Sequence, residues 1–441
     1  MRFLRADLLS GYSIHRPITC ALLGLSFLSW TTRAAAFPRL EEFLAGARNS
    51  AADVREAEYV AIEREADVLS TSGRLLPSLS VSGTYTYNQF DSVMNNGTSE
   101  GIVLQPHNVL SGAAQLTVPL IDVQAWKQHA SARREFSAAE KSTEVTRLEV
   151  GRRIVQYYFS LIGAEALRKA YAESLVAAEE TLSISQTKRD EGAATDLDVA
   201  RAAADVERAR QNVASQEYAV AIARRALTTL SGIKAEGDVP ALDDDLREEE
   251  PLEAWESRLG DDLPSIAAAA EHRTAAEQQV DAAKLAFVPT LSAQVREDVT
   301  SSAGMLGHEV YLTAGLSLSW QFDVSMLGDA RGKEGALGAA RVQEERARQE
   351  AQDAVHEAWQ SVRTGIARSR AARSETEQAL AAVDAANERY TAGSGTQLDL
   401  IQARRDLTSA EASRIQADAD LSYARVALRL AAGELSEGGA R

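Results

Sequence analysis

Apolar and polar residues alternate along four short stretches of the chain. In residues 79–88, leucine, valine and tyrosine alternate with serine, threonine and asparagine. The same period of two recurs in residues 110–118, 291–296 and 310–320. Such alternation is typical of β-strands with one apolar and one polar face. We predict four strands of about 10 residues, the length that a tilted strand needs to cross a bilayer.

Two much longer segments have the composition and spacing of coiled-coil helices. Residues 123–189 contain no proline, are rich in alanine, glutamate, arginine and glutamine, and place Leu148, Val155 and Ile162 seven residues apart. At 1.5 Å per residue this helix would be roughly 100 Å long, far beyond a compact domain. Residues 328–391 repeat the pattern. We therefore predict two long rods.

Shorter helical segments complete the rods. Their summed lengths come close to those of the long segments, so we predict that two half-length helices lie end to end beside each long one. The chain must then leave the rod within a linker, residues 233–263. The acidic runs 243–245 and 248–250 are expected to form a solvated belt in the middle of the rod rather than a metal site. The predicted shorter helices are residues 39–74, 196–231, 264–286 and 396–432.

The chain contains the same order of predicted helices and strands twice. Residues 192–199 match residues 393–400 at a constant offset of 201 residues. Upstream, Pro77 matches Pro289 at an offset of 212, so the first copy has 11 extra residues in one loop. Such repetition indicates an internal duplication. We predict a first structural repeat at residues 37–232, a second at 264–433 and a short C-terminal tail at 434–441.

The N-terminal residues have the pattern of a secretory signal peptide. Three arginines within the first 16 residues precede an apolar stretch at 18–30, and three alanines follow at 34–36. We predict a signal peptide at residues 1–36. The alternative is a membrane anchor helix, but the apolar stretch is shorter than the roughly 20 residues that span a bilayer. The single cysteine, Cys20, lies in this segment, so the mature chain would lack disulfides and thiol catalysis.

Charge and composition narrow the function classes. The chain has 47 Lys and Arg against 64 Asp and Glu, a net charge of −17, which argues against a nucleic-acid partner. The 6 histidines are scattered, so we expect no metal site, no cofactor and no enzyme activity. No apolar run of about 20 residues follows the signal peptide. A membrane-spanning part would therefore have to be a β-barrel.

A sheet of four strands cannot stand alone in lipid, because its two edges would leave backbone groups without hydrogen-bond partners. Three chains would close it into about 12 strands, an even number within the usual range. A soluble sheet packed on a core shows the same alternation, but the long helices favour the membrane interpretation. Tyr85, Tyr87, Tyr311 and Trp320 suit an interfacial aromatic girdle, although packing in a core would look the same.

Three short motifs resemble those of a known family. They are LPSLS at 76–80, VPLID at 118–122 and RYTAG at 389–393, the last followed by Thr396 and Asp399. Their order, duplication and spacing are similar to those of the TolC-type outer-membrane efflux proteins, from about residue 37 to residue 433. The resemblance implies a mainly α-helical chain, with a long antiparallel coiled-coil helical barrel and four strands per chain in a 12-stranded trimeric transmembrane β-barrel.

The resemblance also implies a location and partners. The chain would be a homotrimer in the cell outer membrane, surrounded by lipid, with most of its length in the periplasm. It would be the passive channel of a tripartite efflux or type I secretion system, joined to a periplasmic membrane-fusion adaptor and an inner-membrane pump. In this family the two helix-to-helix turns are the tips where the adaptor docks. The matching residues here are Gly192, Thr195, Gly393 and Thr396.

The gate of the channel is the second feature that the resemblance implies. Asp399 matches a position that lines the constricted entrance, where three copies form an anionic ring. The next aspartate of the family is Gln402 here, which weakens the ring. Asp198 and Tyr390 match a pair whose hydrogen bond helps to hold the channel closed. An arginine that adds a closing contact in the family is Gly395 here.

A periplasmic coiled-coil scaffold or adaptor without a membrane barrel is the alternative function. An adaptor would normally show one helical hairpin within β-rich domains, whereas this sequence duplicates both the hairpin and the strand pair. A pure scaffold would not need four strands of bilayer length. The sequence therefore favours the channel.

Overall fold

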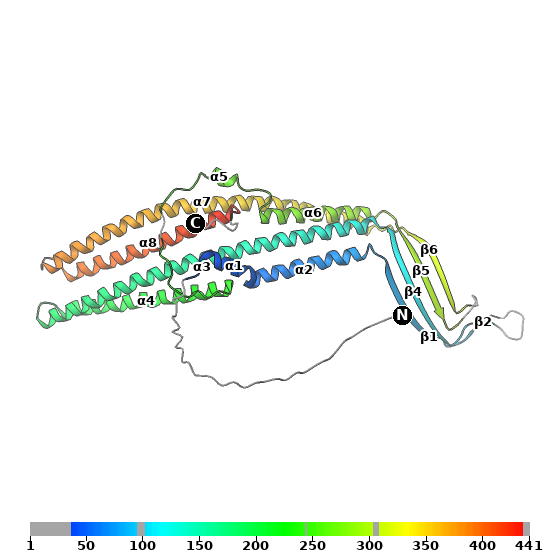
Figure 1. Ribbon diagram of the computed structural model, residues 1–441, viewed down its shortest axis with the longest axis horizontal. Helices are drawn as coiled ribbons and strands as arrows, with labels where there is room; N and C mark the ends of the chain where they lie inside the picture. Colours follow the sequence, from blue (N-terminus) through cyan, green and yellow to red (C-terminus); the bar gives the residue numbers. More distant parts are fainter. Residues whose placement is uncertain (1–36, 95–101, 243–244, 303–307, 435–441) are drawn as a thin grey trace, which may run out of the picture.

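The computed structural model describes residues 37–94, 102–242, 245–302 and 308–434, so the predicted signal peptide, residues 1–36, lies outside it. Two long helical hairpins lie side by side and continue at one end into a β-sheet (Figure 1). The elements are α1 (Leu40–Ser50), α2 (Ala52–Gly73), β1 (Ser78–Tyr87), β2 (Ser92–Met94), β3 (Ile102–Gln105), β4 (Asn108–Ile121), α3 (Val123–Asp190), α4 (Asp196–Ser231), α5 (Leu252–Glu256), α6 (Pro264–Leu285), β5 (Thr290–Thr300), β6 (Val310–Ser319), α7 (Ser325–Thr391) and α8 (Gln397–Ala431).

The two long rods form as predicted, as α3 and α7. α3 begins after Asp122, whose carboxylate accepts a hydrogen bond of 2.8 Å from the amide of Ala125. It ends just before Gly192, where φ is +79°, a left-handed conformation that glycine adopts at little cost. Among the residues that the structure describes, no helix combines the length and the hydropathy needed to cross a membrane.

The half-length helices lie end to end beside the rods, which confirms the prediction. α2 and α4 pack along α3, and α6 and α8 pack along α7. Because α6 and α8 also pack on α3, they join the two halves of the chain. Between α3 and α6, for example, the Ser131 hydroxyl donates to the Ala275 carbonyl over 3.0 Å. The result is one helical layer, with α7 at one edge and α2 and α4 at the other (Figure 1).

The predicted helix over residues 39–74 is wrong at one point, because it breaks into α1 and α2. At Ala51 the backbone is extended, with φ −63° and ψ 128°. The side chain of Ala51 is buried, and the hydroxyl of Ser50 donates to the carbonyl of Leu230 at 3.2 Å. This contact fastens the end of α1 to the end of α4. The helix preference of this segment is therefore outweighed by its tertiary contacts in the middle of the rod.

The linker packs against the rod more closely than predicted. Trp255 of α5 is only 3% exposed and lies among apolar residues of α7 and α8, including Val355 and Leu428. Glu249 forms an ion pair with Arg425 of α8, and both side chains are largely buried. The prediction of a solvated acidic belt is therefore wrong at Glu249, because its carboxylate is paired with the largely buried guanidinium of Arg425. Residues 243–244 of the other acidic run lie outside the described part.

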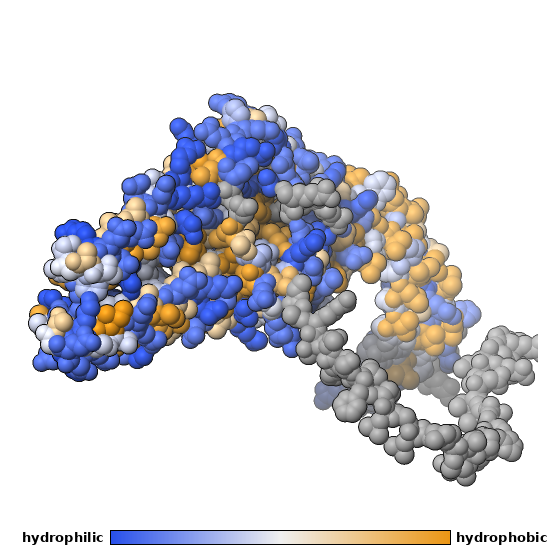
Figure 2. Space-filling view, turned by 60° about the vertical axis from the view of Figure 1, so that its left-hand side comes forward, coloured by the Kyte–Doolittle hydropathy of each residue, from blue (hydrophilic) through white to orange (hydrophobic). Residues whose placement is uncertain are grey.

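The four long strands form one antiparallel sheet in the order β1-β4-β5-β6. Leu79 lies opposite Leu116, which lies opposite Val295, so these apolar side chains share one face. On the other face Gln115 lies between Ser80 and a polar residue of β5. Apolar surface gathers over the strands in Figure 2, whereas the helical part is mostly hydrophilic there. The predicted strands and their two different faces are confirmed.

Two details of the sheet differ from the predictions. The extra residues of the first copy include a small hairpin, β2–β3, which the alternation did not reveal. Tyr311 lies opposite Asp298, on the polar face, so its predicted place in an apolar girdle is wrong. Tyr85 and Tyr87 share the apolar face with Leu79. Tyr311 directly precedes Leu312, which is on the apolar face. Because neighbouring residues of a strand point to opposite faces of the sheet, Tyr311 points to the polar face.

Candidate functional site

The far ends of the two hairpins, opposite the sheet, form the first candidate site. In the first hairpin, Gly192 follows α3, and no atom lies within 4 Å of the position that a Cβ would occupy there. Thr195 then caps α4: its hydroxyl donates to the Asp198 carboxylate at 2.7 Å, and the Asp198 amide donates back to that hydroxyl at 3.2 Å. This capping box satisfies the first backbone donors of the helix.

The second hairpin repeats this turn. Gly393 has a φ of +74° and is equally unobstructed. The Thr396 hydroxyl donates to the Asp399 carboxylate at 2.8 Å, and the Asp399 amide donates back at 3.2 Å. In both turns the threonine hydroxyl, helped by the threonine amide, lowers the pKa of the aspartate. The two tips therefore each carry an ionised carboxylate at neutral pH.

The predicted gate residues lie at these tips but are engaged in other contacts within the chain. Asp198 is bonded to Thr195, and among the described residues no hydrogen bond joins it to Tyr390. The ammonium of Lys188, near the end of α3, lies 3.9 Å from the centre of the Tyr390 ring. Gln402 donates to Asp406 at 2.8 Å, one turn further along α8. The predicted latch between Asp198 and Tyr390 stays a prediction.

Sequence reasoning missed the residues that join the two tips. Gln397, at the start of α8, is only 8% exposed, and its amide donates to the hydroxyl of Ser185 on α3 at 2.6 Å. Arg404 lies two turns further along α8 and donates to the hydroxyl of Thr181 at 2.6 Å. Polar residues recur at helical spacing on α3, which is a visible signal. Their partners are more than 200 residues away in the sequence, so the signal alone does not identify them.

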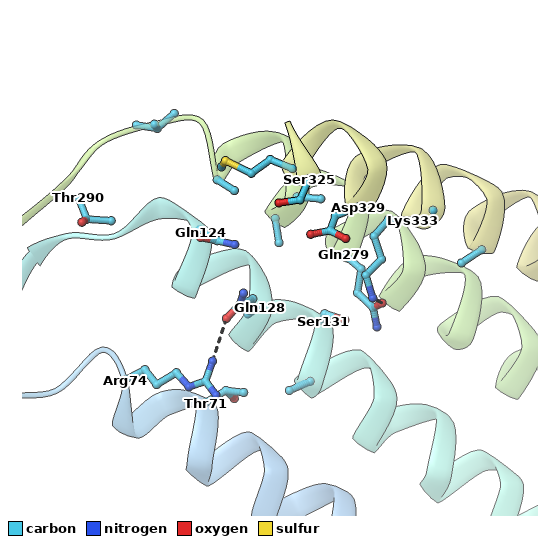
Figure 3. Close-up of a pocket in the computed structure, with 18 of the residues that line it drawn as sticks. Thr71, Arg74, Gln124, Gln128, Ser131, Gln279, Thr290, Ser325, Asp329 and Lys333 are labelled. Carbon is cyan, nitrogen blue, oxygen red and sulfur yellow. Dashed lines mark hydrogen bonds between the residues drawn. The ribbon is translucent and has the colours of Figure 1, made fainter. Parts of the chain in front are cut away.

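A polar hollow near the junction of helices and sheet is the second candidate site. It has a volume of about 1110 Å³ and is lined by residues of α2, α3, α6 and α7. In Figure 3, Gln124, Asp329 and Lys333 line this space, and Arg74 donates to Gln128 at 3.2 Å. Polar and charged side chains, with glycine and alanine, make up most of the lining. Such a wall suits a water-filled passage better than tight binding of an apolar ligand.

A histidine of α6 pairs with one carboxylate of this wall. His272 of α6 lies 3.1 Å from the carboxylate of Glu135, which lines the hollow. This hydrogen bond is the main cause that raises the pKa of His272, against the opposing effect of burial. Among the described residues, no group of three or more histidine, cysteine or acidic side chains is arranged to hold a metal ion.

The fold and the two sites together define a class of protein. A duplicated helical hairpin forms a layer with a polar hollow, and an apolar-faced antiparallel sheet continues from it. Such a chain is one subunit of a membrane channel with a long helical extension. The model of the outer membrane efflux protein family matches residues 44–233 and 258–434. The chain belongs to the outer membrane efflux protein family.

Individual proteins agree with this assignment. The toluene efflux pump outer membrane protein TtgC of Pseudomonas putida is 24% identical over 356 residues, which cover 77% of this chain and 72% of TtgC. The Campylobacter jejuni CmeC outer membrane channel has a similar fold, with a TM-score of 0.78 at 18% identity, over 95% of this chain and 94% of that one. The outer-membrane channel OprN has a TM-score of 0.76 at 21% identity, over 90% of each chain.

The family membership decides between the two functions that the sequence left open. The chain is an outer-membrane channel component of tripartite efflux, located in the cell outer membrane with its helical part in the periplasm. The family is one of efflux channels. The alternative of a periplasmic scaffold or adaptor without a barrel has no support in these comparisons.

Proposed function

We propose that three copies of the chain close into one passive duct, which opens at its helix tips when a periplasmic membrane-fusion adaptor docks there. The open edges of the sheet carry this proposal. β1 and β6 are its outer strands, and strand edges without partners are not tolerated in lipid. Three copies of a 4-stranded sheet give about 12 strands, which suits a closed barrel. Lipid would then cover the apolar face, and water the polar one.

The helical layer extends this barrel into the periplasm. We propose that repeats 37–232 and 264–433, joined by the linker 233–263, each supply one hairpin of the wall. The polar hollow of Figure 3 would belong to the wall of the duct. An exit of this kind selects little, so the inner-membrane pump would do most of the choosing of cargo. Because TtgC is named for toluene efflux and the similar ArpC for antibiotic efflux, we favour small organic molecules over secreted polypeptides.

The tips supply the entrance in this proposal. Their ionised carboxylates and exposed turns support it. Asp399 and Gln402 would line the opening, with Asp198 and Tyr390 beside it. The residues proposed to receive the adaptor are Gly192, Thr195, Gly393 and Thr396.

Native mass determination combined with planar-bilayer recording tests the duct. Protein extracted from outer membranes should have the mass of three mature chains and should conduct in discrete steps. A soluble monomer or dimer without conductance would reject the closed barrel. The latch is tested separately by Tyr390→Phe, which should increase the leak of large antibiotics, with Tyr218→Phe on an exposed face of α4 as the control. An unchanged leak would show that Tyr390 forms no latch.

A further inference from the structure

The charged residues of the four-stranded sheet are few, and all of them lie on one strand. β1, β4 and β6 contain no Asp, Glu, Lys or Arg. β5 contains three in a row, Arg296, Glu297 and Asp298. Arg296 and Asp298 point to the polar face and form an ion pair at 2.9 Å. Glu297, between them, therefore points to the opposite, apolar face, which meets lipid in the proposed barrel.

The register of the strands places the Glu297 side chain among apolar residues. Glu297 lies opposite Ala114 of β4 and Leu312 of β6. Val295 and Val299 flank it on the same face of its own strand. The side chain is exposed, and within the described part of the chain no hydrogen bond or ion pair reaches its carboxylate. An unpaired charge that faces lipid is costly, which makes Glu297 a candidate for a functional site.

The chain itself supplies no cation to this carboxylate. Arg296 is the only lysine or arginine in residues 285–330, and residues 75–126 contain none. The guanidinium of Arg296 is on the other face of the sheet, with Asp298. A neighbouring copy in the barrel would join this sheet through β1 or β6, which are uncharged. A cation that neutralises Glu297 therefore has to come from the membrane.

Glu297 lies near the end of the barrel that faces the cell exterior. β5 begins beside the helices, which extend into the periplasm, and runs away from them (Figure 1). Glu297 is three residues from the last residue of β5, Thr300, a distance of about 10 Å along the strand. One row closer to this end, Gly112 and Gly83 lie opposite each other, and no atom comes closer than 3.7 Å to an added Cβ at either glycine. These two glycines leave room for a lipid head group beside the carboxylate.

We propose that Glu297 is a lipid-contact site, where the carboxylate binds a divalent cation that also binds the phosphate of a lipid in the outer leaflet. Mg²⁺ is commonly held by one or two carboxylates together with phosphate oxygens and water. The carboxylate repels a bare phosphate, and no lysine or arginine of the four strands lies on this face to attract one. The cation is therefore needed between the two groups. This inference rests on the proposed closed barrel, in which each copy carries one such site.

Native mass determination of the purified trimer with added lipid A, a phosphorylated glycolipid, tests the site. In Mg²⁺ the native trimer should retain lipid A, and EDTA should remove most of it. Glu297→Gln should retain several-fold less in Mg²⁺, because a neutral amide binds the cation poorly. Glu309→Gln, which removes an exposed carboxylate just before β6, is the matched control and should retain lipid A like the native trimer. Equal retention by the native trimer and Glu297→Gln would overturn the proposal, and so would retention by the native trimer that EDTA leaves unchanged.

Reversing the charge separates the cation bridge from a purely structural role of Glu297. Glu297→Lys places an ammonium at the same position, and an ammonium binds phosphate directly. This variant should retain lipid A in EDTA, whereas Glu297→Gln should not. Lipid A without its phosphates should be retained poorly by the native trimer and by both variants. The phosphate bridge would be wrong if Glu297→Lys lost lipid A in EDTA, or if the dephosphorylated lipid were retained equally well.

Planar-bilayer recording distinguishes this site from the pore. Because Glu297 faces lipid, Glu297→Gln should conduct with the native step size and the native preference between cations and anions. A changed ion preference would place Glu297 inside the pore and overturn the assignment. A native protein that formed no trimer and no conducting channel would reject the proposed function itself, whatever its retention of lipid A.

Discussion

The middle and the tip of the rod hold their helices together by different chemistry. In the middle, Phe43 of α1, Leu161 of α3 and Leu227 of α4 are fully buried in one apolar cluster. At the tip, α3 and α8 meet through Ser185 and Gln397, also buried, but hydrogen-bonded. A buried leucine or phenylalanine contributes about 1.5–3 kcal/mol, whereas a hydrogen bond contributes a net value of about 1 kcal/mol. The apolar cluster also includes Leu430 of α8, so the two hairpins are held more tightly in the middle of the rod than at the tip.

Phe43→Ala should destabilise the middle of the rod and have the largest effect. The Phe43 ring is fully buried and lies 5.7 Å from the ring of Phe37 and 6.1 Å from that of Tyr158. Removing it leaves a cavity, so the free energy of unfolding should fall by about 3–5 kcal/mol. Denaturant unfolding of the purified protein measures the loss. Phe43→Leu, which fills more of the space, should lose clearly less, and equal losses would argue against a packing role.

Thr396→Ala should loosen the tip with an intermediate effect. The Thr396 hydroxyl binds both the carboxylate and the amide of Asp399. Loss of an N-cap costs about 1 kcal/mol, so amide hydrogen exchange in the first turn of α8 should accelerate by about fivefold. Exchange at Phe43 in the middle of the rod should not change. Thr396→Ser keeps the hydroxyl and should exchange like the native chain; acceleration there too would point to the lost methyl group instead.

The same division explains what could be predicted from the sequence. The helices and strands follow from local patterns: heptad spacing in α3, alternation in β1, and a threonine three residues before an aspartate at each tip. The bounds of α4 agree with the prediction because Thr195 and Gly232 mark its two ends within the sequence itself. Such signals need no knowledge of what lies opposite in the fold.

The remaining features depend on contacts between distant residues. The break at Ala51 arises because Ser50 meets the end of α4, and the burial of Trp255 arises because α5 meets α7. Neither partner is near in the sequence. The resemblance implies a role for Asp198 at a tip, but it does not show that the Thr195 hydroxyl already donates a hydrogen bond to this carboxylate. The pairing of Gln397 with Ser185 is visible only once α8 lies on α3.

Glu411→Gln should have the smallest effect, and in the opposite direction, because it should stabilise the tip half of the rod. The pKa of Glu411 on α8 is raised by burial, and Glu173 on α3 adds to the rise while Arg414 opposes it. A carboxyl group whose pKa is raised by folding stabilises the fold when protonated, so this contribution is complete below the unfolded value of 4.5 and is lost as the pH rises through the raised pKa. At neutral pH the ionised group therefore weakens the packing of α8 on α3.

Glu411→Gln removes this charge, so its thermal unfolding midpoint should exceed that of the native chain at pH 7.5 and approach it at pH 4.5. Glu350→Gln, on an exposed part of α7, serves as the control. If the native chain and Glu411→Gln differed equally at both pH values, the ionisation of Glu411 would not be the cause of the difference.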